Sequence, residues 1–316
     1  MSWNGVIFRF SSETQVPIIS HALGGEPKDI YDRIPYSAIV DRKPLTLPDG
    51  GRVIVWPVVN LEEWIPTEPL PRRILTPPGE GQHVPDIPNW CWYEYGMRIG
   101  VWRLMEVFRE FDITPTVSMN ATVVDRYSRV SEAALKMDWE FMGHSYVQKA
   151  MFLVDDEREA VFKTSEHLQK FCGYKPRGWM GPGLTQTEKT PELLVEAGFE
   201  YTADWILDDQ PVPVNTDAGP LYSVPYTTEL NDIPIMLSQA HVSSILYERT
   251  MDYVDAVYDE GKDNVRVMSV AVHPYIHGVP HRIKYFRKIF EELSAKPGVV
   301  FMTGAQILDW YLAQQD

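Results

Sequence analysis

Two adjacent carboxylates, Glu62 and Glu63, follow a short apolar segment at residues 53–59 that is rich in β-branched side chains. Such a segment is typical of a strand buried in a parallel sheet. A carboxylate at the end of a buried strand loses part of its hydration, which raises its pKa and suits it to act as a general base. The alternative is a solvated glutamate pair at a strand end. Asn60, two residues before Glu62, is expected to contact a substrate bound at this position.

Two histidines stand at the ends of other apolar segments. His144 follows residues 139–142, and His273 follows residues 265–272. Imidazole both ligates metal ions and transfers protons near pH 7, although a lone histidine more often makes a structural hydrogen bond. A carboxylate such as Asp204 could orient His273 for proton transfer.

The segment from Arg177 to Gly183 combines an arginine with three glycines. Glycines let a ligand approach the backbone closely, and a guanidinium grips a carboxylate through two hydrogen bonds, so Arg177 is expected to orient a carboxylate. His281 follows Pro280, which is expected to begin a helix. The positive end of the helix dipole disfavours an imidazolium there, so His281 would be a neutral, substrate-orienting group. The expected substrate contacts in these parts of the chain are Trp179, Gly181, Trp205 and His281.

Apolar segments alternate with amphipathic ones along most of the chain, which predicts an α/β fold with a parallel sheet whose strands are each followed by a helix. The expected strands lie at residues 53–59, 116–119, 139–142, 177–180, 201–203, 265–272 and 299–302. The expected helices lie at residues 94–111, 121–136, 156–171, 191–197, 243–260 and 280–295, and a last helix begins at a capping box of Thr303 and Gln306.

This pattern predicts an arm or cover at residues 1–51 and a single catalytic barrel domain at residues 52–316, with an irregular insertion at residues 204–240. Reactive groups in such barrels lie at the carboxyl ends of the strands. The polar clusters described above all follow expected strands. We therefore expect them to share one active site.

The chain carries 44 acidic and 29 basic residues, a net charge of -15. Such a chain repels a phosphate backbone, so nucleic acid is not expected as a partner. No segment reaches ~18 consecutive apolar residues, and the amino terminus lacks a basic segment followed by an apolar one; we expect neither membrane insertion nor secretion. The two cysteines, Cys91 and Cys172, have no metal-finger spacing and are expected to be unpaired in a reducing cytoplasm.

The order of these motifs resembles that of the polysaccharide deacetylase superfamily, which includes chitin and peptidoglycan deacetylases and a cofactor-free allantoinase branch. The resemblance extends over roughly residues 52 to 312 and implies a distorted (β/α)7-type barrel. The family's first motif, Thr-Phe-Asp-Asp, corresponds to Asn60-Leu61-Glu62-Glu63, and its second, His-Ser-x-x-His, corresponds to His144-Ser145-Tyr146-Val147-Gln148. Its third motif, an arginine with following proline and glycine, corresponds to residues 177–183. Its Asp-Trp pair corresponds to Asp204-Trp205, and its late histidine corresponds to His273.

The resemblance also implies a role for these residues. Glu62 would be the general base, and Glu63 and His144 would bind a metal ion; a slip of one residue in the first motif would exchange the roles of the two glutamates. His273 would protonate the leaving amine with help from Asp204.

Gln148 stands where the family has its second metal-binding histidine. An amide oxygen is a much poorer zinc ligand than imidazole, so a three-ligand site is incomplete. The allantoinase branch departs from the metal-binding pattern as well. Two alternatives stay open, one zinc-like divalent metal ion or no metal at all.

The sequence therefore predicts a hydrolase of a non-peptide carbon–nitrogen bond in a small linear or cyclic amide. One rival is a deacetylase of N-acetyl sugars of the chitin or peptidoglycan type. A second rival is a catalytically inactive barrel that binds a ligand, because Gln148 already breaks one motif. The expected partner is a small-molecule amide, and a homo-oligomer is compatible with the sequence.

Overall fold

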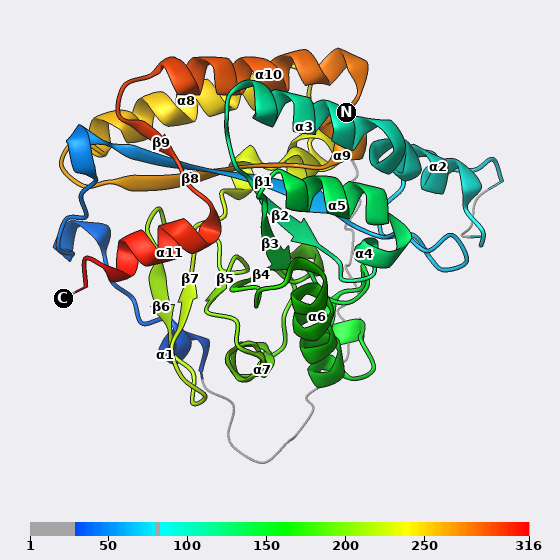
Figure 1. Ribbon diagram of the computed structural model, residues 1–316, viewed down its shortest axis with the longest axis horizontal. Helices are drawn as coiled ribbons and strands as arrows, with labels where there is room; N and C mark the ends of the chain where they lie inside the picture. Colours follow the sequence, from blue (N-terminus) through cyan, green and yellow to red (C-terminus); the bar gives the residue numbers. More distant parts are fainter. Residues whose placement is uncertain (1–28, 80–82, 316) are drawn as a thin grey trace, which may run out of the picture.

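The computed structural model describes residues 29–79 and 83–315. Its central feature is a curled, mostly parallel sheet (Figure 1) in which neighbouring strands follow the order β6-β7-β5-β4-β3-β2-β1-β8, with β9 paired to β1. The strands are β1 (Val53–Leu61), β2 (Thr116–Met119), β3 (Glu140–Gly143), β4 (Gly178–Trp179), β5 (Tyr201–Thr202), β6 (Val212–Val214), β7 (Leu221–Ser223), β8 (Arg266–Val272) and β9 (Val299–Phe301). The predicted α/β fold is confirmed, as a half-barrel whose sheet curls but, among the described residues, is not closed by strand pairing.

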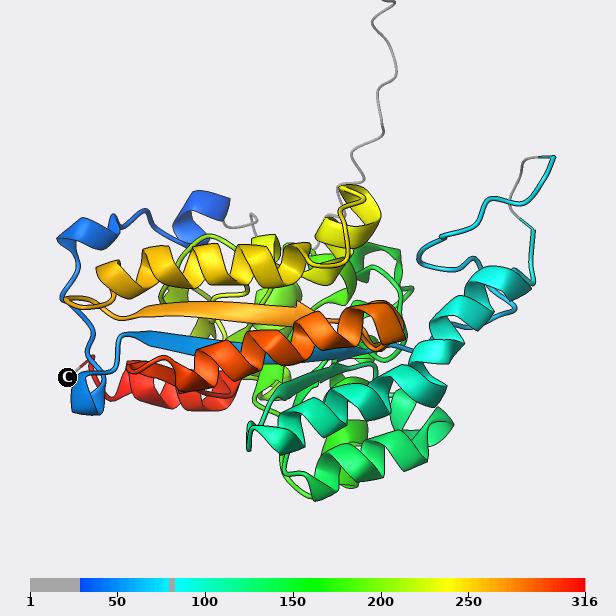
Figure 2. The ribbon, with the colours of Figure 1, turned by 90° about the horizontal axis from the view of Figure 1, so that it is seen from above.

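The helices are α1 (Ile30–Arg33), α2 (Ile87–Tyr95), α3 (Val101–Glu110), α4 (Val123–Arg126), α5 (Ser128–Lys136), α6 (Glu157–Cys172), α7 (Thr190–Ala197), α8 (Ile245–Glu260), α9 (Pro274–His277), α10 (Pro280–Ala295) and α11 (Gly304–Leu312). Most of the long helices cover the outer face of the sheet, whereas α11 packs inside its curl through Ile307 and Leu308. Helices α8 and α10 lie side by side over β1 and β8 (Figures 1 and 2). The capping box predicted for the last helix is present, with Thr303 and Gln306 bonding reciprocally. In the described residues, no helix is long and apolar enough to cross a membrane.

Strand β1 is buried along its whole length because both of its faces are covered. Successive side chains of a strand point to opposite faces. The even-numbered residues Ile54, Trp56 and Val58 pack into an inner core inside the curl of the sheet, whereas the odd-numbered Val53, Val55, Val59 and Leu61 pack against the outer helices. The inward series continues to Asn60 and Glu62 at the carboxyl end of β1. This alternation turns Glu62 inward and Glu63 outward.

The edges of β1 explain why the barrel is distorted. One edge pairs with β8 from Val53 to Val59. The other edge is divided, because β9 pairs with its first three residues and β2 with its last four. Two strands that share one edge diverge from each other, and the sheet splays at that point.

The predicted irregular insertion contains structure that the sequence pattern did not reveal. Its two short strands, β6 and β7, form the antiparallel hairpin of the sheet. The chain then returns along the free edge of β8, where Thr227 and Ser269 exchange hydrogen bonds of 2.6 and 2.9 Å, and Asn231 forms a bridge to Ala271. Three-residue strands carry too little periodicity to be predicted. This return segment brings the next residue, Asp232, to the end of β8.

The predicted helix at residues 94–111 starts earlier, as α2, and continues into α3 through a π-helical turn at Gly96–Gly100. A Cβ added at Gly100 would overlap the carbonyl oxygen of Pro274, and one at Gly96 would overlap the backbone nitrogen of Tyr275. The two glycines therefore let the turn lie directly on α9. That short helix begins immediately after His273.

Part of the predicted arm packs on the barrel through ion pairs. Arg33 donates to the Glu192 carboxylate at 2.8 and 2.9 Å, and Arg42 donates to Asp208 at 2.9 and 2.6 Å. Leu45, which belongs to the same arm, is buried. Residues 1–28 of the predicted arm lie outside the described residues.

We predict that Gly100→Ala lowers the free energy of unfolding by about 1–3 kcal/mol, because the added methyl group forces α9 away from the π-helical turn. Chemical denaturation monitored by circular dichroism measures the change. Glu106→Ala is the control, since Glu106 lies exposed on the adjacent α3 and its removal should change stability by less than about 0.5 kcal/mol. Equal stability of both variants would show that α9 is free to shift.

Candidate active site

Glu62 occupies the centre of a buried polar cluster at the carboxyl end of β1, and it is 3% exposed. Its Oε2 accepts a hydrogen bond of 2.7 Å from the indole Nε1 of Trp64 and one of 3.4 Å from the hydroxyl of Tyr275. Its Oε1 accepts a bond of 2.8 Å from the amide Nε2 of Gln148. Donors on both oxygens fix the orientation of the carboxylate. Trp64 and Gln148 are therefore positioning groups that sequence reasoning did not assign.

His273 lies between two carboxylates. Its Nε2 is 3.5 Å from Oε1 of Glu62, and its Nδ1 is 2.7 Å from Oδ1 of Asp232. The backbone nitrogen of His273 also donates to Oδ2 of Asp232 at 2.8 Å, and Nδ1 of His277 lies 2.9 Å from the same oxygen. All four side chains are buried. Asp232 thus sets both the position and the ring orientation of His273.

Glu62, His273 and Asp232 form a row of charges, and the charge of each member is fixed by its neighbours. Burial lowers the pKa of His273, but the charge of Asp232, its hydrogen bond and those of Glu62 outweigh burial and raise the pKa to about 9. Burial raises the pKa of Glu62, but the hydrogen bond and charge of His273 lower it to about 2. The pKa of Asp232 falls to about 2 in the same way, against burial. Near neutral pH the row is carboxylate, imidazolium, carboxylate.

This charge state makes the stability of the fold depend on pH. Because the pKa of folded His273 lies above its usual value of about 6.5, the imidazolium contributes stability that is fully present below that pH and is lost as the pH rises through about 9. The two carboxylates have lowered pKa values, so their contribution is present above pH ~4.5 and is lost as the pH falls through about 2.

His144 stands on the other side of Glu62. Its Nδ1 lies 2.7 Å from the carbonyl oxygen of Met180, so Nδ1 carries the hydrogen. Burial lowers the pKa of His144 to about 4, which makes the ring neutral at pH 7. Its bare Nε2, 4.0 Å from Oε1 of Glu62, is therefore a hydrogen-bond acceptor.

Asn60 is the predicted substrate contact that the structure brings to this cluster. Its amide nitrogen donates weakly to the Tyr226 hydroxyl and to the carbonyl of Val272, at 3.4 Å each. Its Oδ1 is buried and has no hydrogen-bond partner in the described residues, and the same is true of Oε1 of Gln148. The site therefore holds two acceptor oxygens that a ligand could satisfy.

Arg177 and Trp179 are not brought to the cluster. Arg177 immediately precedes β4, so it lies at the amino end of the sheet, where its guanidinium binds Glu200 and Asp309. Trp179 is fully buried and packs edge-on against Phe199. The expected roles in orienting a carboxylate and contacting substrate are therefore wrong for these two residues.

Asp204 does not contact His273, because four strands separate β5 from β8 in the sheet. Its Oδ1 instead accepts a bond of 2.7 Å from the backbone nitrogen of Gly181, next to the carbonyl that holds His144. Burial raises the pKa of Asp204 to about 7. The predicted partnership of Asp204 with His273 is replaced by that of Asp232. Gly181 and Asp204 support the backbone behind His144.

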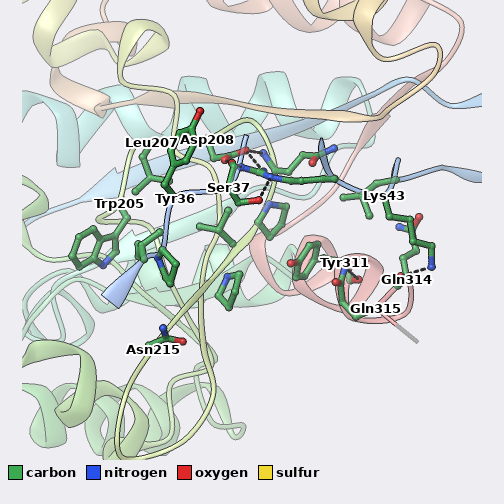
Figure 3. A pocket seen from close by; sticks show the side chains of 18 of the residues that line it. Tyr36, Ser37, Lys43, Trp205, Leu207, Asp208, Asn215, Tyr311, Gln314 and Gln315 are labelled. Atoms are coloured by element: carbon green, nitrogen blue, oxygen red, sulfur yellow. Dashed lines mark hydrogen bonds and ion pairs between the residues drawn. The ribbon is translucent and has the colours of Figure 1, made fainter. Parts of the chain in front are cut away.

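Trp205 and His281 lie away from Glu62. Trp205 lines a cavity of about 1010 Å³ between the arm and residues 205–215, with Tyr36, Tyr311 and others (Figure 3); neither Glu62 nor His273 lines that cavity. His281 is exposed in the first turn of α10. The structure therefore does not support either residue as a substrate contact at the cluster.

Comparisons with known proteins show which proteins the chain resembles. No family model matches the chain. A Schizosaccharomyces pombe protein provisionally named a polysaccharide deacetylase is 26% identical over 241 residues, 70% of this chain and 75% of the relative. The peptidoglycan deacetylase of Helicobacter pylori is 22% identical over 254 residues, 68% and 84% of the two chains. The crystal structure of Puue allantoinase superposes with a TM-score of 0.77 at 26% identity, covering 92% of this chain and 99% of that one.

The chain is thus similar in sequence and in fold to polysaccharide deacetylases and to an allantoinase, as its motifs predicted. The activity of these relatives, hydrolysis of carbon–nitrogen bonds other than peptide bonds, is the class of activity that the sequence predicted.

The metal site that the superfamily resemblance implies does not fit the residues of this chain. Glu63 faces outward and accepts a bond of 3.1 Å from Arg126. Gln148 directs its amide nitrogen, a donor, at Glu62. Across residues 29–79 and 83–315, no group of three or more His, Cys, Asp or Glu side chains is arranged to hold a metal ion. Glu63 and His144 are therefore not placed together as ligands of one metal ion.

We predict that His273 titrates with a pKa of about 9 and that Asp232→Asn lowers this pKa below about 7, since the largest charge that stabilises the imidazolium is removed. NMR titration of the ring resonances measures both values. Asp204→Asn is the matched control and should leave the pKa of His273 unchanged, because Asp204 bonds to Gly181. If Asp204→Asn instead lowered the pKa of His273, Asp204 would be the partner of His273.

Proposed function

We propose that this protein hydrolyses a carbon–nitrogen bond of a small linear or cyclic amide, with Glu62 as general base and His273 as general acid. The observation that carries the proposal is the imidazolium of His273 held between the carboxylates of Glu62 and Asp232. A buried base and a buried, charged acid in direct contact form an acid–base pair that is ready before substrate arrives.

Glu62 activates the water. A water molecule that donates one hydrogen bond to Oε1 of Glu62 and one to the bare Nε2 of His144 has its lone pairs free to attack the carbonyl carbon. The water oxygen then bonds to that carbon, and its proton passes to Glu62. Burial raises the pKa of Glu62, and this effect is opposed by the interactions of Glu62 with His273 and with its other neighbours. The basicity of Glu62 therefore rises as His273 gives up its charge.

His273 completes the reaction. An amide nitrogen cannot leave as an anion near neutral pH and needs a proton on its side of the bond. The Nε2 proton of His273 passes to the nitrogen, the carbon–nitrogen bond breaks, and the resulting neutral ring remains held by Asp232 at 2.7 Å. The proton on Glu62 can then return to His273, 3.5 Å away, which restores the resting charges.

The surroundings of Glu62 favour a small amide over a sugar polymer. Trp64 and Tyr275 are both 1% exposed and enclose the carboxylate from one side. The buried acceptor oxygens of Asn60 and Gln148 without partners in the described residues match the N–H groups of an amide. The similarity to an allantoinase over 92% of the chain supports the same choice.

The test is an assay of ring opening of hydantoin-type compounds beside acetate release from chitooligosaccharides. We expect ring opening only, and Glu62→Gln should lower its turnover by ~10²–10⁴-fold, as usual for loss of a general base. Glu63→Gln should be nearly normal, because Glu63 pairs with Arg126 outside the cluster. Release of acetate alone would favour the N-acetyl sugar deacetylase, and ligand binding without turnover of any amide would favour the inactive barrel.

We further predict that thorough treatment with a chelator leaves turnover unchanged, because Gln148 directs a donor nitrogen at Glu62 and Glu63 is paired with Arg126, so neither supplies a ligand atom beside His144. Metal content measured by atomic emission before and after treatment establishes removal. Loss of activity that returns on addition of Zn²⁺ would contradict this expectation.

A further inference from the structure

His277 lies one helical turn after His273, on the short helix α9. Its backbone nitrogen donates to the carbonyl oxygen of His273 at 3.0 Å, so the two residues stand at positions i and i+4. Side chains at this spacing lie on the same face of a helix. Both rings therefore reach one carboxylate, that of Asp232.

The ring of His277 is fixed in position by its surroundings. The next residue, Gly278, lies so close to the π-helical turn that an added Cβ would overlap the Cα of Gly100. His277 itself is fully buried, and its ring packs against that of Phe286 at a centroid distance of 6.5 Å. Backbone and side-chain packing together leave the ring one place, beside Asp232.

The bond to Asp232 is the polar contact that the ring of His277 makes. Its Nδ1 lies 2.9 Å from Oδ2 of Asp232, and because a carboxylate oxygen carries no hydrogen, Nδ1 is the donor. Its Nε2 is buried and has no hydrogen-bond partner in the described residues. A buried polar atom without a partner lowers stability, so a histidine kept only for structure would be expected to use both nitrogens.

Asp232 receives three N–H groups. Two come from His273, through its backbone nitrogen at 2.8 Å and its Nδ1 at 2.7 Å, and the third comes from His277. Across residues 29–79 and 83–315, no other side chain bonds to Asp232. The neighbouring charges are Glu62, 3.5 Å from Nε2 of His273, and Arg282 of α10, which donates to a backbone carbonyl of α9 at 3.2 Å. His277 is thus the contact of Asp232 that does not involve His273.

The hydrogen bond from His277 weakens Asp232 as a base. Each N–H that bonds to a carboxylate stabilises its charged form, and so leaves less negative charge to hold the imidazolium of His273. A general acid works best when its pKa lies near the operating pH. The neighbours of His273 already raise its pKa to about 9. A carboxylate with one donor fewer would hold this proton more tightly and slow its release.

We propose that His277 is a positioning residue of the acid–base pair, which acts through Asp232 and limits how tightly Asp232 holds the proton of His273. The inference rests on the proposed function and adds to it the group that adjusts the acid. No bond to His277 forms or breaks in the reaction. Its Nδ1–H stays on Oδ2 of Asp232 while the Nε2 proton of His273 passes to the leaving nitrogen.

NMR titration of the ring resonances of His273 tests this role. His277→Leu removes the donor and keeps an apolar side chain of similar volume. It should raise the pKa of His273 by about 1, the size of effect expected from one hydrogen bond to a charged group. His277→Asn places an amide N–H where Nδ1 stood and should restore the wild-type value. An unchanged or lowered pKa of His273 in His277→Leu would overturn the proposal.

Phe286→Leu is the matched control. It loosens the packing around His277 and leaves the Nδ1 donor in place. It should lower the stability of the fold and leave the pKa of His273 unchanged. If Phe286→Leu raised this pKa as much as His277→Leu does, the packing of α9 rather than the donor would set the acid, and the role of His277 would be refuted.

Turnover of hydantoin gives a second readout. His277→Leu should lower kcat roughly 3- to 10-fold, because the acid releases its proton less readily, and should shift the basic limb of the pH profile upward by about 1 with the pKa of His273. KM should stay the same, since His277 is fully buried. His277→Asn should keep the wild-type kcat. A rise in KM without a change in kcat would contradict the proposal.

Nitrogen-15 NMR of the wild-type protein separates failure of this inference from failure of the proposed function, because it needs neither turnover nor a variant. The Nδ1 of His277 should carry a hydrogen, and a bare Nδ1 would overturn the inference even if hydantoin is hydrolysed. If no amide is turned over while the Nδ1 hydrogen and the pKa shift in His277→Leu are both observed, the proposed function fails and the control of His273 by His277 stands.

Discussion

The structure depends on one row of charges, Glu62, His273 and Asp232, held out of water. Isolated buried ions each cost several kcal/mol of desolvation, and only good geometry with additional hydrogen bonds offsets that cost. Here the central imidazolium lies 3.5 Å from one carboxylate oxygen and 2.7 Å from the other. Every member has further donors or acceptors. Removal of one member would leave the others uncompensated, so the row is both the chemical centre and a structural constraint.

The fold supplies these members from places that lie far apart in the chain. Strand β1 turns Glu62 inward through the alternation of its side chains, and the adjacent β8 ends at His273. The return segment bonded along the edge of β8 delivers Asp232. Close packing of the π-helical turn on α9 then fixes Tyr275 and His277 around the two ends of the row.

The same cluster shows how the site can differ from a three-ligand metal centre without losing its acid–base pair. The amide of Gln148, which replaces a ligand histidine of the superfamily pattern, donates to the base. His144 stays neutral because it is buried, and it contributes an acceptor rather than a charge. The orientation of Glu62 thus comes from hydrogen-bond donors, and its low pKa in the resting state comes mainly from His273.

The sequence by itself determined the alternation of strands and helices, the last helix cap, and the presence of Glu62, His144 and His273 at strand ends, because these follow from local periodicity and residue chemistry. It left Glu62 and Glu63 interchangeable, and the alternation of β1 in its tertiary setting decided between them. Strand order also decided that the partner of His273 is Asp232 rather than Asp204. Asp232 lies 41 residues before His273, inside a segment without periodicity. Arg177 was assigned to the wrong end of its strand for the same physical reason. Which side chains meet in space depends on pairing between distant segments, and local sequence patterns carry no information on those distances.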